Sequence, residues 1–330
     1  FDVVMVESVS DEIKKHLPQL ADPDGLRYWR KVLRMAALCH DIGHLPFSHA
    51  AEKELLPEGW DHERMTRELI LSKEMREIWA SLTPPLRAED IVKLALGPKK
   101  AADLQFNDWE AILSEIIIGD AFGVDRMDYL LRDSYHSGVA YGKFDHYRLI
   151  DSLRILPSPP SSEKEEQSLE PTLGVDAGGL HTAEALLLAR YFMFTQVYFH
   201  PVRRIYDIHL KDYLQDWLPG GRFSTDVDSH MRLTDNEVIS ALRKAAHDSR
   251  EDGHEHARRI IDRGHFKVLY ERNPEDIAVN RNAAQAIFEA VKTQYGPERV
   301  RMDFYKQKGG SPNFPVLTRD SRIVSSLAES

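Results

Sequence analysis

The segment LCHDIGHLPFSH (residues 38–49) constrains this chain more than any other part of it. Inside a helix, the adjacent side chains of His40 and Asp41 would diverge by about 100°. At a helix end they can converge on one ion, because Gly43 permits an abrupt turn and Pro46 prevents simple continuation. Imidazole and carboxylate together suit a transition metal or a mixed Mg/Mn site, and not calcium, which takes oxygen ligands.

The alternative is a histidine-rich surface turn with solvated rings, since histidine is common at half-buried surfaces. Two features favour a site instead. His44, His49 and then His62 follow the His-Asp pair, and a matching carboxylate, Asp125, comes later in the chain. A cluster with a carboxylate from a second element is the arrangement expected of a metal or catalytic centre.

The composition narrows the class of protein. The chain has 330 residues, of which 42% are hydrophobic, enough for one large core or a core plus a smaller lobe. Its net charge of −10 argues against extensive nucleic-acid binding. The single cysteine, Cys39, excludes a disulfide framework and fits a reducing compartment. Without an apolar run of membrane length or a signal-peptide pattern, we expect a cytoplasmic protein without membrane contact.

Apolar residues recur at three- and four-residue spacing, which predicts a mainly helical fold. The expected helices are 3–17, 26–39, 62–72, 88–96, 109–120, 124–135, 180–200, 203–218, 235–246 and 274–292. Strand-like alternation is found at 266–270, 299–305, 314–317 and 322–327, and 173–179 is typical of a strand end and turn. We therefore expect a helical domain over 1–218 and a smaller C-terminal α/β lobe over 219–330. The Pro-, Ser- and Glu-rich stretch 157–167 predicts a mobile loop.

A second informative segment is GVDRMDYLLRD (123–133). On a helix, Asp125, Tyr129 and Asp133 share one face because they recur every four residues. With Arg126 beside Asp125, this face could complete a metal site and hold an anionic ligand. An ordinary amphipathic helix with a polar face explains the same pattern.

The third segment contains Arg190, which interrupts an apolar helix. A buried guanidinium needs an anionic partner. That partner is either an internal carboxylate, such as Glu184 or Asp133, or the phosphates of a substrate, which the planar guanidinium fits well. Tyr198 follows two turns later on the same face. The chain has no P-loop, no dinucleotide-binding glycine motif and no nucleophile elbow, which excludes the common nucleotide folds.

Together these residues resemble the HD-domain dNTP triphosphohydrolases, a group that includes the sterile-alpha-motif-plus-HD dNTPase and its prokaryotic relatives. The resemblance spans nearly the whole chain and lies in 38–52, 61–63 (DHE), 123–142, 187–200, 233–238 (LTDNEV) and 316–327. It implies a helical HD-domain core and hydrolysis of dNTPs to deoxynucleoside and triphosphate. It also implies a divalent metal (Mg, Mn, Fe, Co, Ni or Zn), a dimeric or tetrameric homo-oligomer and, as in many members, an activating allosteric nucleotide.

The resemblance also implies a role for each matching residue. His40, Asp41 and Asp125 resemble the metal ligands. Four residues resemble the catalytic and phosphate-contacting groups of the family: His44, His49, Glu52 and His62. Glu52 stands where the family often has an aspartate that pairs with the equivalent of His62. Five residues resemble substrate contacts: Arg126, Tyr129, Asp133, Arg190 and Tyr198. The two arginines resemble contacts to the triphosphate, Tyr129 a residue on the phosphate or metal side, and Asp133 and Tyr198 contacts to the sugar. We expect His49 to act as the general acid.

One family feature is missing from the sequence. The first metal histidine would precede Phe1, and the only upstream histidine, His16, lies in a lysine-flanked stretch typical of surface. The absence of an initial Met indicates that the chain is the tail of a longer protein, whose preceding residues we expect to supply this histidine. A degraded site is the alternative.

Three other functions remain open. One is an HD phosphohydrolase acting on another nucleotide or a phosphodiester. Another is a non-catalytic HD protein that senses nucleotides or serves as a scaffold. The last, a nucleic-acid-binding module, is disfavoured by the acidic charge.

Overall fold

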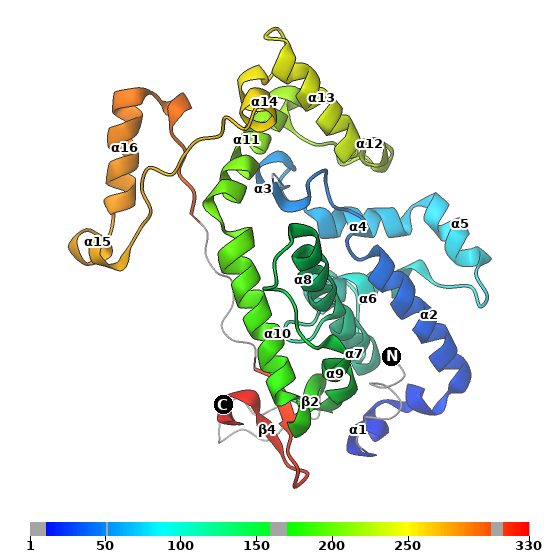
Figure 1. Ribbon diagram of the computed structural model, residues 1–330. Helices are drawn as coiled ribbons and strands as arrows, with labels where there is room; N and C mark the ends of the chain where they lie inside the picture. The colour runs from blue at the N-terminus through cyan, green and yellow to red at the C-terminus, as the bar shows by residue number, and fades with distance from the viewer. Residues whose placement is uncertain (1–10, 51, 159–169, 305–312, 330) are drawn as a thin grey trace. The chain divides into compact units, whose positions relative to one another are not determined.

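The computed structural model describes residues 11–50, 52–158, 170–304 and 313–329 (Figure 1). These residues are mainly helical, with a small sheet of four strands, so the predicted fold class is confirmed. Contacts divide the chain into two compact units. The first comprises 1–44, 60–194 and 309–330, and the second comprises 45–59 and 195–308.

This grouping differs from a division of the chain at residue 218. The difference arises because the two C-terminal strands, β3 (Pro315–Leu317) and β4 (Ile323–Ser325), join a sheet of the first unit. The sheet therefore combines residues from the middle and the end of the sequence. The first unit is discontinuous in the chain.

The first unit is built from helices that carry the predicted site residues. Its helical elements are α1 (Asp11–His16), η2 (Pro18–Ala21), α2 (Pro23–Cys39), α4 (His62–Leu71), α5 (Lys73–Ser81), α6 (Ala88–Lys100), α7 (Asp108–Ile118), α8 (Val124–Ser137), α9 (His146–Ser152), η4 (Ala177–Gly179), α10 (Leu180–Met193) and α17 (Ser326–Glu329). The π-helical stretch η5 (Phe194–Tyr198) follows α10 directly, and all of it except Phe194 belongs to the second unit.

Helix α2 delivers the His-Asp pair. The Asp22 side chain accepts a hydrogen bond from the Asp24 amide, which caps the helix, and a proline occupies its first turn. Its buried face consists of Val32, Leu33, Ala36 and Cys39. This apolar stripe packs against α6 and α7 and brings His40, the next residue, to the interior edge of the unit.

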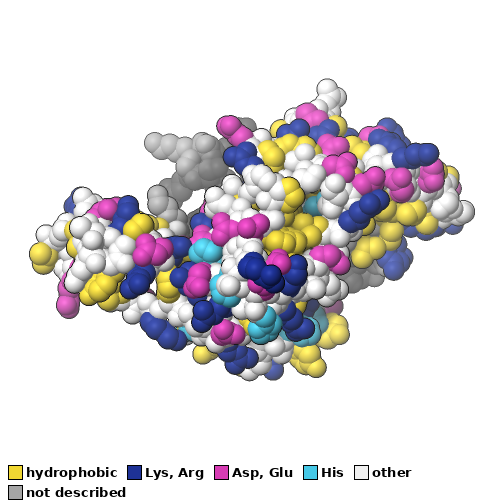
Figure 2. Space-filling view, turned by 90° about the horizontal axis from the view of Figure 1, so that it is seen from above, with side chains coloured by type: hydrophobic (Ala, Val, Ile, Leu, Met, Phe, Trp, Pro, Cys, Tyr) yellow, Lys and Arg dark blue, Asp and Glu magenta, His cyan; other side chains and the backbone are white. Residues whose placement is uncertain are grey.

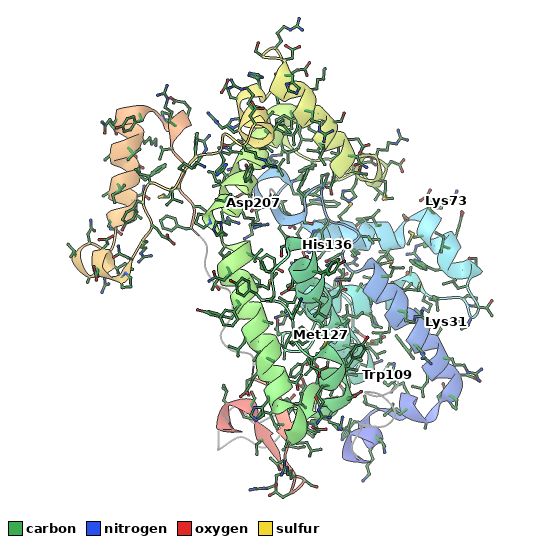
Figure 3. All side chains as sticks on the ribbon, in the orientation of Figure 1. Lys31, Lys73, Trp109, Met127, His136 and Asp207 are labelled. Carbon is green, nitrogen blue, oxygen red and sulfur yellow. The ribbon has the colours of Figure 1, made fainter. Side chains whose placement is uncertain are left out.

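Helices α7 and α8 form the core beside α2. A reciprocal capping box of Asn107 and Glu110 starts α7. Trp109 in α7 and Met127 in α8 are buried among these helices, whereas Lys31 is exposed (Figure 3). Gly123 precedes α8 at a position where a Cβ atom would lie 2.6 Å from the Ile117 carbonyl oxygen, so the turn requires glycine.

The sheet has the strand order β1-β2-β3-β4. β1 (Leu153–Pro157) and β2 (Pro171–Asp176) are antiparallel, with Leu153 opposite Val175. β2 and β3 are parallel, with Val175 opposite Val316, and β3 and β4 are antiparallel. The Glu115 carboxylate on α7 accepts hydrogen bonds from the Thr172 hydroxyl (2.9 Å) and the Leu173 amide (3.3 Å), which ties the sheet to the helices.

The second unit contains the remaining helices. They are η3 (Ser48–Ala50), α3 (Glu52–Leu55), α11 (Pro201–Trp217), η6 (Pro219–Gly221), α12 (Val227–Arg232), α13 (Asp235–His247), α14 (His254–Ile261), α15 (Pro274–Val279), α16 (Ala283–Tyr295) and η7 (Pro297–Arg299). α14 packs against both α11 and α13, and η3 and α3 also contact α11. The second unit is therefore organised around α11.

Several local predictions were wrong or incomplete. Residues 266–270 and the described part of 299–305 form no strand, because no neighbouring strand of the described sheet pairs with them, and Arg299 ends the helical turn η7. The predicted helix 274–292 is interrupted at 280–282, where Asn280 caps the turn. Periodicity missed β1, α5, α9, α12 and α14, which are all short. Most of helix 3–17 and of loop 157–167 lies outside the described residues.

Charges of both signs are interspersed over the face shown in Figure 2, with histidines visible between them. No large field of one sign covers this face, in agreement with the moderate net charge of −10. Within the described ranges, no helix combines the length and the apolar content that crossing a membrane requires.

A buried histidine of the second unit makes stability depend on pH. Burial, aided by the charge of Arg259, lowers the pKa of His209 to about 4. Between pH 6.5 and about 4 the unfolded chain therefore binds a proton at this residue that the folded unit does not, so stability falls as the pH falls. Replacing His209 with Gln should flatten this part of the pH dependence in denaturant unfolding. The exposed His247 provides the control: a His247→Gln variant with an equally flattened profile would contradict the assignment.

Candidate functional site

The turn after α2 is fixed by its contact with α4. The Thr66 hydroxyl accepts a hydrogen bond from the Gly43 amide (3.0 Å) and donates one to the His40 carbonyl (3.1 Å). A Cβ atom on Gly43 would lie 2.3 Å from the His62 carbonyl oxygen, so only glycine permits this approach. The glycine of the His-Asp motif therefore brings the turn against the start of α4.

His40, Asp41 and Asp125 converge within the first unit. His40 Nε2 lies 3.4 Å from an oxygen of Asp41 and 3.2 Å from an oxygen of Asp125. One ligand atom from each of the three lies within 4.8 Å of the others. Ligand atoms around a single metal ion are separated by comparable distances, because each lies about 2.0–2.2 Å from it.

The orientation of the His40 ring indicates what is bound there. Its Nδ1 lies 2.8 Å from the Ala37 carbonyl oxygen, which can only accept, so Nδ1 carries the proton. In the neutral ring, the Nε2 lone pair therefore faces two carboxylates, and this buried atom has no hydrogen-bond partner among the described residues. Burial lowers the pKa of His40, but the Asp125 and Asp41 carboxylates outweigh it and raise the pKa to about 8. The group needs a cation, and its donor atoms fit a divalent metal.

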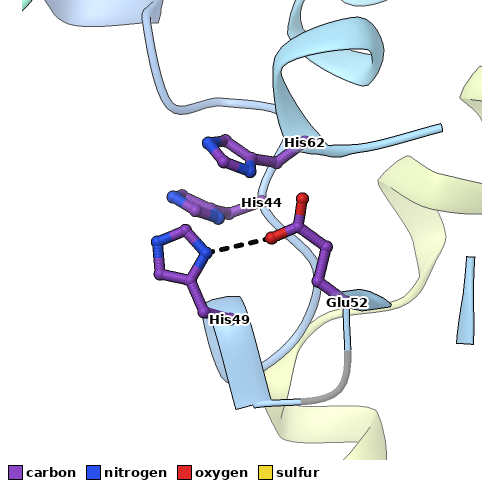
Figure 4. Close-up of side chains that lie close together, drawn as sticks. All are labelled: His44, His49, Glu52 and His62. Atoms are coloured by element: carbon purple, nitrogen blue, oxygen red, sulfur yellow. Dashed lines mark hydrogen bonds and ion pairs between the residues drawn. The ribbon is translucent and has the colours of Figure 1, made fainter. Parts of the chain in front are cut away.

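Two more of the predicted histidines lie together in this unit. The rings of His44 and His62 are stacked, with centroids 4.2 Å apart and planes inclined by 14° (Figure 4). His44 Nε2 lies 3.4 Å from the same Asp41 oxygen that faces His40. Stacking and the shared carboxylate therefore place both rings next to the candidate metal ligands.

His49 and Glu52 form a pair in the second unit. His49 Nδ1 and an oxygen of Glu52 are 2.9 Å apart, the hydrogen bond drawn in Figure 4. His49 is exposed and Glu52 is buried, so the carboxylate is fixed while the ring faces solvent. The hydrogen bond described here joins Glu52 to His49, and the pairing of Glu52 with His62 that the family resemblance implies stays a prediction.

Arg126 and Arg190 lie side by side in the first unit. One Arg126 nitrogen donates to Asp120 (3.0 Å), while its buried Nη1 has no partner among the described residues. Burial and the charge of Arg126 lower the pKa of Arg190. Arg190 hydrogen-bonds to the Tyr129 phenol, and no ion pair in the described chain engages it. The carboxylates of the described residues therefore neutralise the positive charges of Arg126 and Arg190 only in part.

Glu184, one of the two internal carboxylates suggested as a partner of Arg190, is hydrogen-bonded to His181 (2.9 Å). Asp133 lies half-buried on α8, one turn beyond Tyr129, and Tyr198 lies half-buried in η5. Sequence reasoning missed Asp120, whose only signal was its place in the loop that precedes α8. His16 is exposed at the end of α1.

A second group of possible metal ligands, His209, Asp212 and His256, lies in the second unit. Cations already occupy it: Arg301 donates two hydrogen bonds to one Asp212 oxygen, at 2.9 and 2.8 Å. Arg259 Nη1 lies 3.4 Å from His256 Nδ1. Because these guanidinium groups repel a further cation, we assign this group a structural role.

Removal of one carboxylate tests the metal assignment. Asp125→Ala should abolish binding of a divalent metal at this site, because it leaves an incomplete ligand set. Metal content after dialysis measures the effect, and circular dichroism should show that α8 remains folded. Asp128→Ala, on the exposed side of the same helix, is the matched control and should retain the metal. Equal metal content in the two variants would contradict the assignment.

Comparisons with known proteins agree with this geometry. Residues 4–133 match the HD domain and 144–294 match the HD associated region. The uncharacterized protein YwfO of Bacillus subtilis is 32% identical over 209 residues, 62% of this chain and 40% of that protein. The human deoxynucleoside triphosphate triphosphohydrolase SAMHD1 is 26% identical over 276 residues, 73% of this chain and 42% of that protein. The chain spans less than half the length of these relatives.

Two solved structures share the fold. A hypothetical protein from Aquifex aeolicus has a TM-score of 0.69 and 32% identity, covering 97% of this chain and 76% of its own. A phosphohydrolase from Bacteroides thetaiotaomicron, with a TM-score of 0.61 and 19% identity, shows the fold alone and covers 97% and 80%. HD domains bind divalent metals, as the His40, Asp41 and Asp125 group requires. This chain therefore belongs to the HD-domain family and carries an HD-associated region.

Proposed function

We propose that the protein hydrolyses deoxynucleoside triphosphates to deoxynucleoside and inorganic triphosphate. The observation that carries the proposal is the pair of neighbouring cations, Arg126 on α8, which also carries Asp125 and Tyr129, and Arg190 on α10. A guanidinium nitrogen that is buried without a partner, next to a second guanidinium, favours a ligand with several negative charges. A triphosphate supplies them.

The spacing along α8 suits a nucleotide. Asp125, Tyr129 and Asp133 follow one another every four residues, so they extend about 12 Å along one face of the helix. We assign Asp125 to the metal, Tyr129 to the phosphates beside Arg190, and Asp133 to the sugar 3′-hydroxyl. Tyr198 is proposed to lie under the sugar. Relatives named as deoxynucleoside triphosphate triphosphohydrolases, from human, mouse and chicken, support this choice of substrate.

The reaction needs one water and one proton transfer. The bond between the 5′-oxygen and the α-phosphorus breaks, the water oxygen joins the phosphorus, and the 5′-oxygen receives a proton. A divalent metal held by His40, Asp41 and Asp125 would supply Lewis-acid chemistry and lower the pKa of water. Arg126 and Arg190 would neutralise charge that grows on the triphosphate.

His49 is the proposed proton donor to the 5′-oxygen. Its ring is exposed to an incoming ligand, and its hydrogen bond to the buried Glu52 carboxylate orients it. Only five positions separate it from His44, which limits how far the two rings can be from each other. We place His44 and His62 against the phosphates. Activation by an allosteric nucleotide and assembly into a dimer or tetramer remain predictions from the family resemblance.

The products distinguish the proposal from other phosphohydrolase reactions. Incubation with each dNTP and Mg²⁺, Mn²⁺ or Co²⁺ should release deoxynucleoside and intact triphosphate, which chromatography separates. Asp125→Ala should release neither. The appearance of deoxynucleoside monophosphate and pyrophosphate would instead assign the protein to another class of phosphohydrolase.

Arg190→Lys tests the triphosphate contact. The change should weaken dNTP binding or turnover roughly ten- to a hundredfold, which corresponds to about 1.4–2.8 kcal/mol for a lost bidentate contact. The melting temperature should barely change, because the charge and the packed alkyl stem remain. Arg132→Lys, at an exposed pair with Asp128 on α8, is the control and should leave both quantities unchanged. A lower melting temperature with unchanged kinetics would make Arg190 a structural residue.

A further inference from the structure

The loop that carries His49 and Glu52 has an uncommon backbone conformation. Phe47 and Ser48 both have positive φ angles, of 61° and 55°. This left-handed region is rarely occupied by residues with a β-carbon, and two such residues in succession need support from their surroundings. His49 follows immediately, so these two residues determine where its side chain lies.

The support comes from residues 218–235 of the same unit. The Phe47 amide donates a hydrogen bond to an Asp235 oxygen at 2.8 Å, across 188 positions of sequence. Other contacts of the same segment support the loop on either side of this hydrogen bond. Leu45 and Pro46 line a pocket of about 390 Å³ together with residues 218, 219, 222–224, 229, 230 and 233. The Phe223 amide donates to the Leu55 carbonyl at 2.9 Å.

The segment LTDNEV (233–238) is built so that Asp235 is available for this contact. Thr234 and Glu237 form a capping box that satisfies the first amides of α13. Val238 is fully buried and anchors the helix. Asp235, at the first helical position, is not needed for the cap, and its carboxylate accepts a hydrogen bond from the Phe47 amide instead.

We propose that Asp235 is a positioning residue: its hydrogen bond to the Phe47 amide holds the left-handed turn and thereby sets the location of the His49–Glu52 pair. The effect on turnover rests on the proposed function, in which His49 donates a proton. The effect on the loop does not. The alternative is that Asp235 only stabilises the start of α13 through the helix dipole, as an acidic residue in any first turn would.

Two substitutions separate these roles. Asp235→Ala removes both the acceptor and the negative charge, whereas Asp235→Asn removes the charge but keeps an oxygen that can accept from the Phe47 amide. Asp228→Ala, at an exposed acidic residue in the first turn of α12, is the matched control. Melting temperature is measured for all three, so that activity is compared per folded molecule.

The first readout is local and independent of activity. In Asp235→Ala, hydrogen exchange at the Phe47 amide should accelerate about tenfold or more, because the amide loses its acceptor. The ring resonances of His49, measured by NMR, should shift. Asp235→Asn and Asp228→Ala should resemble the wild type in both measurements. Unchanged exchange and unchanged His49 resonances in Asp235→Ala would overturn the proposal.

The second readout is turnover. Asp235→Ala should lower kcat about tenfold or more with little change in KM, because displacement of a catalytic group by about 1 Å can cost a hundredfold in rate. Asp235→Asn should recover most of the loss. Equal losses in the Asn and Ala variants would overturn the proposal in favour of the helix-dipole role. If the wild-type protein releases no triphosphate, the proposed function fails, while the exchange and resonance measurements still decide the role of Asp235.

Discussion

Two carboxylates facing an imidazole lone pair form the constraint on which the first unit depends. The carboxylates of Asp41 and Asp125 repel each other, yet the fold brings an oxygen of each within 3.4 Å of His40 Nε2, where a positive charge, on the protonated ring or on a metal ion, relieves the repulsion. Three separate features maintain this arrangement: the Ala37 carbonyl that fixes the ring, the Gly43 turn seated on Thr66, and the start of α8 after Gly123. Each restricts local structure in order to hold donor atoms where a metal ion would relieve their repulsion.

A complementary imbalance of charge lies further along α8. The chain as a whole is acidic, but Arg126 and Arg190 are half-buried together, with Asp120 as the one carboxylate bonded to either in the described structure. The metal ligands thus carry unneutralised negative charge, and the arginines carry unneutralised positive charge. A metal complex of a polyphosphate matches both. Electrostatic complementarity of this kind is more informative than the fold, because one fold can serve many substrates.

The sequence indicated most of this arrangement. Helical periodicity located α2, α8 and α10, and the four-residue spacing of Asp125, Tyr129 and Asp133 predicted their common face. The pairing of His49 with Glu52 could not be inferred, because it depends on the left-handed turn at Phe47 and Ser48, which neither residue favours by itself. Asp120 and Asp235 were missed for a related reason. Each acts through a contact made by folding, and no local pattern distinguishes it from other surface acids.

The parallel pairing of β2 with β3 has a practical consequence. Between these two strands the chain passes through α10 and the whole of 195–308, so the strand that covers one side of β2 is supplied by the last part of the sequence. A version of the protein shortened before residue 315 would keep every candidate ligand but expose the backbone of Val175 and Asp176 in β2 as an unpaired edge. Bare edges of apolar strands recruit other strands. Such a version is expected to self-associate, so that loss of solubility could be mistaken for loss of the site.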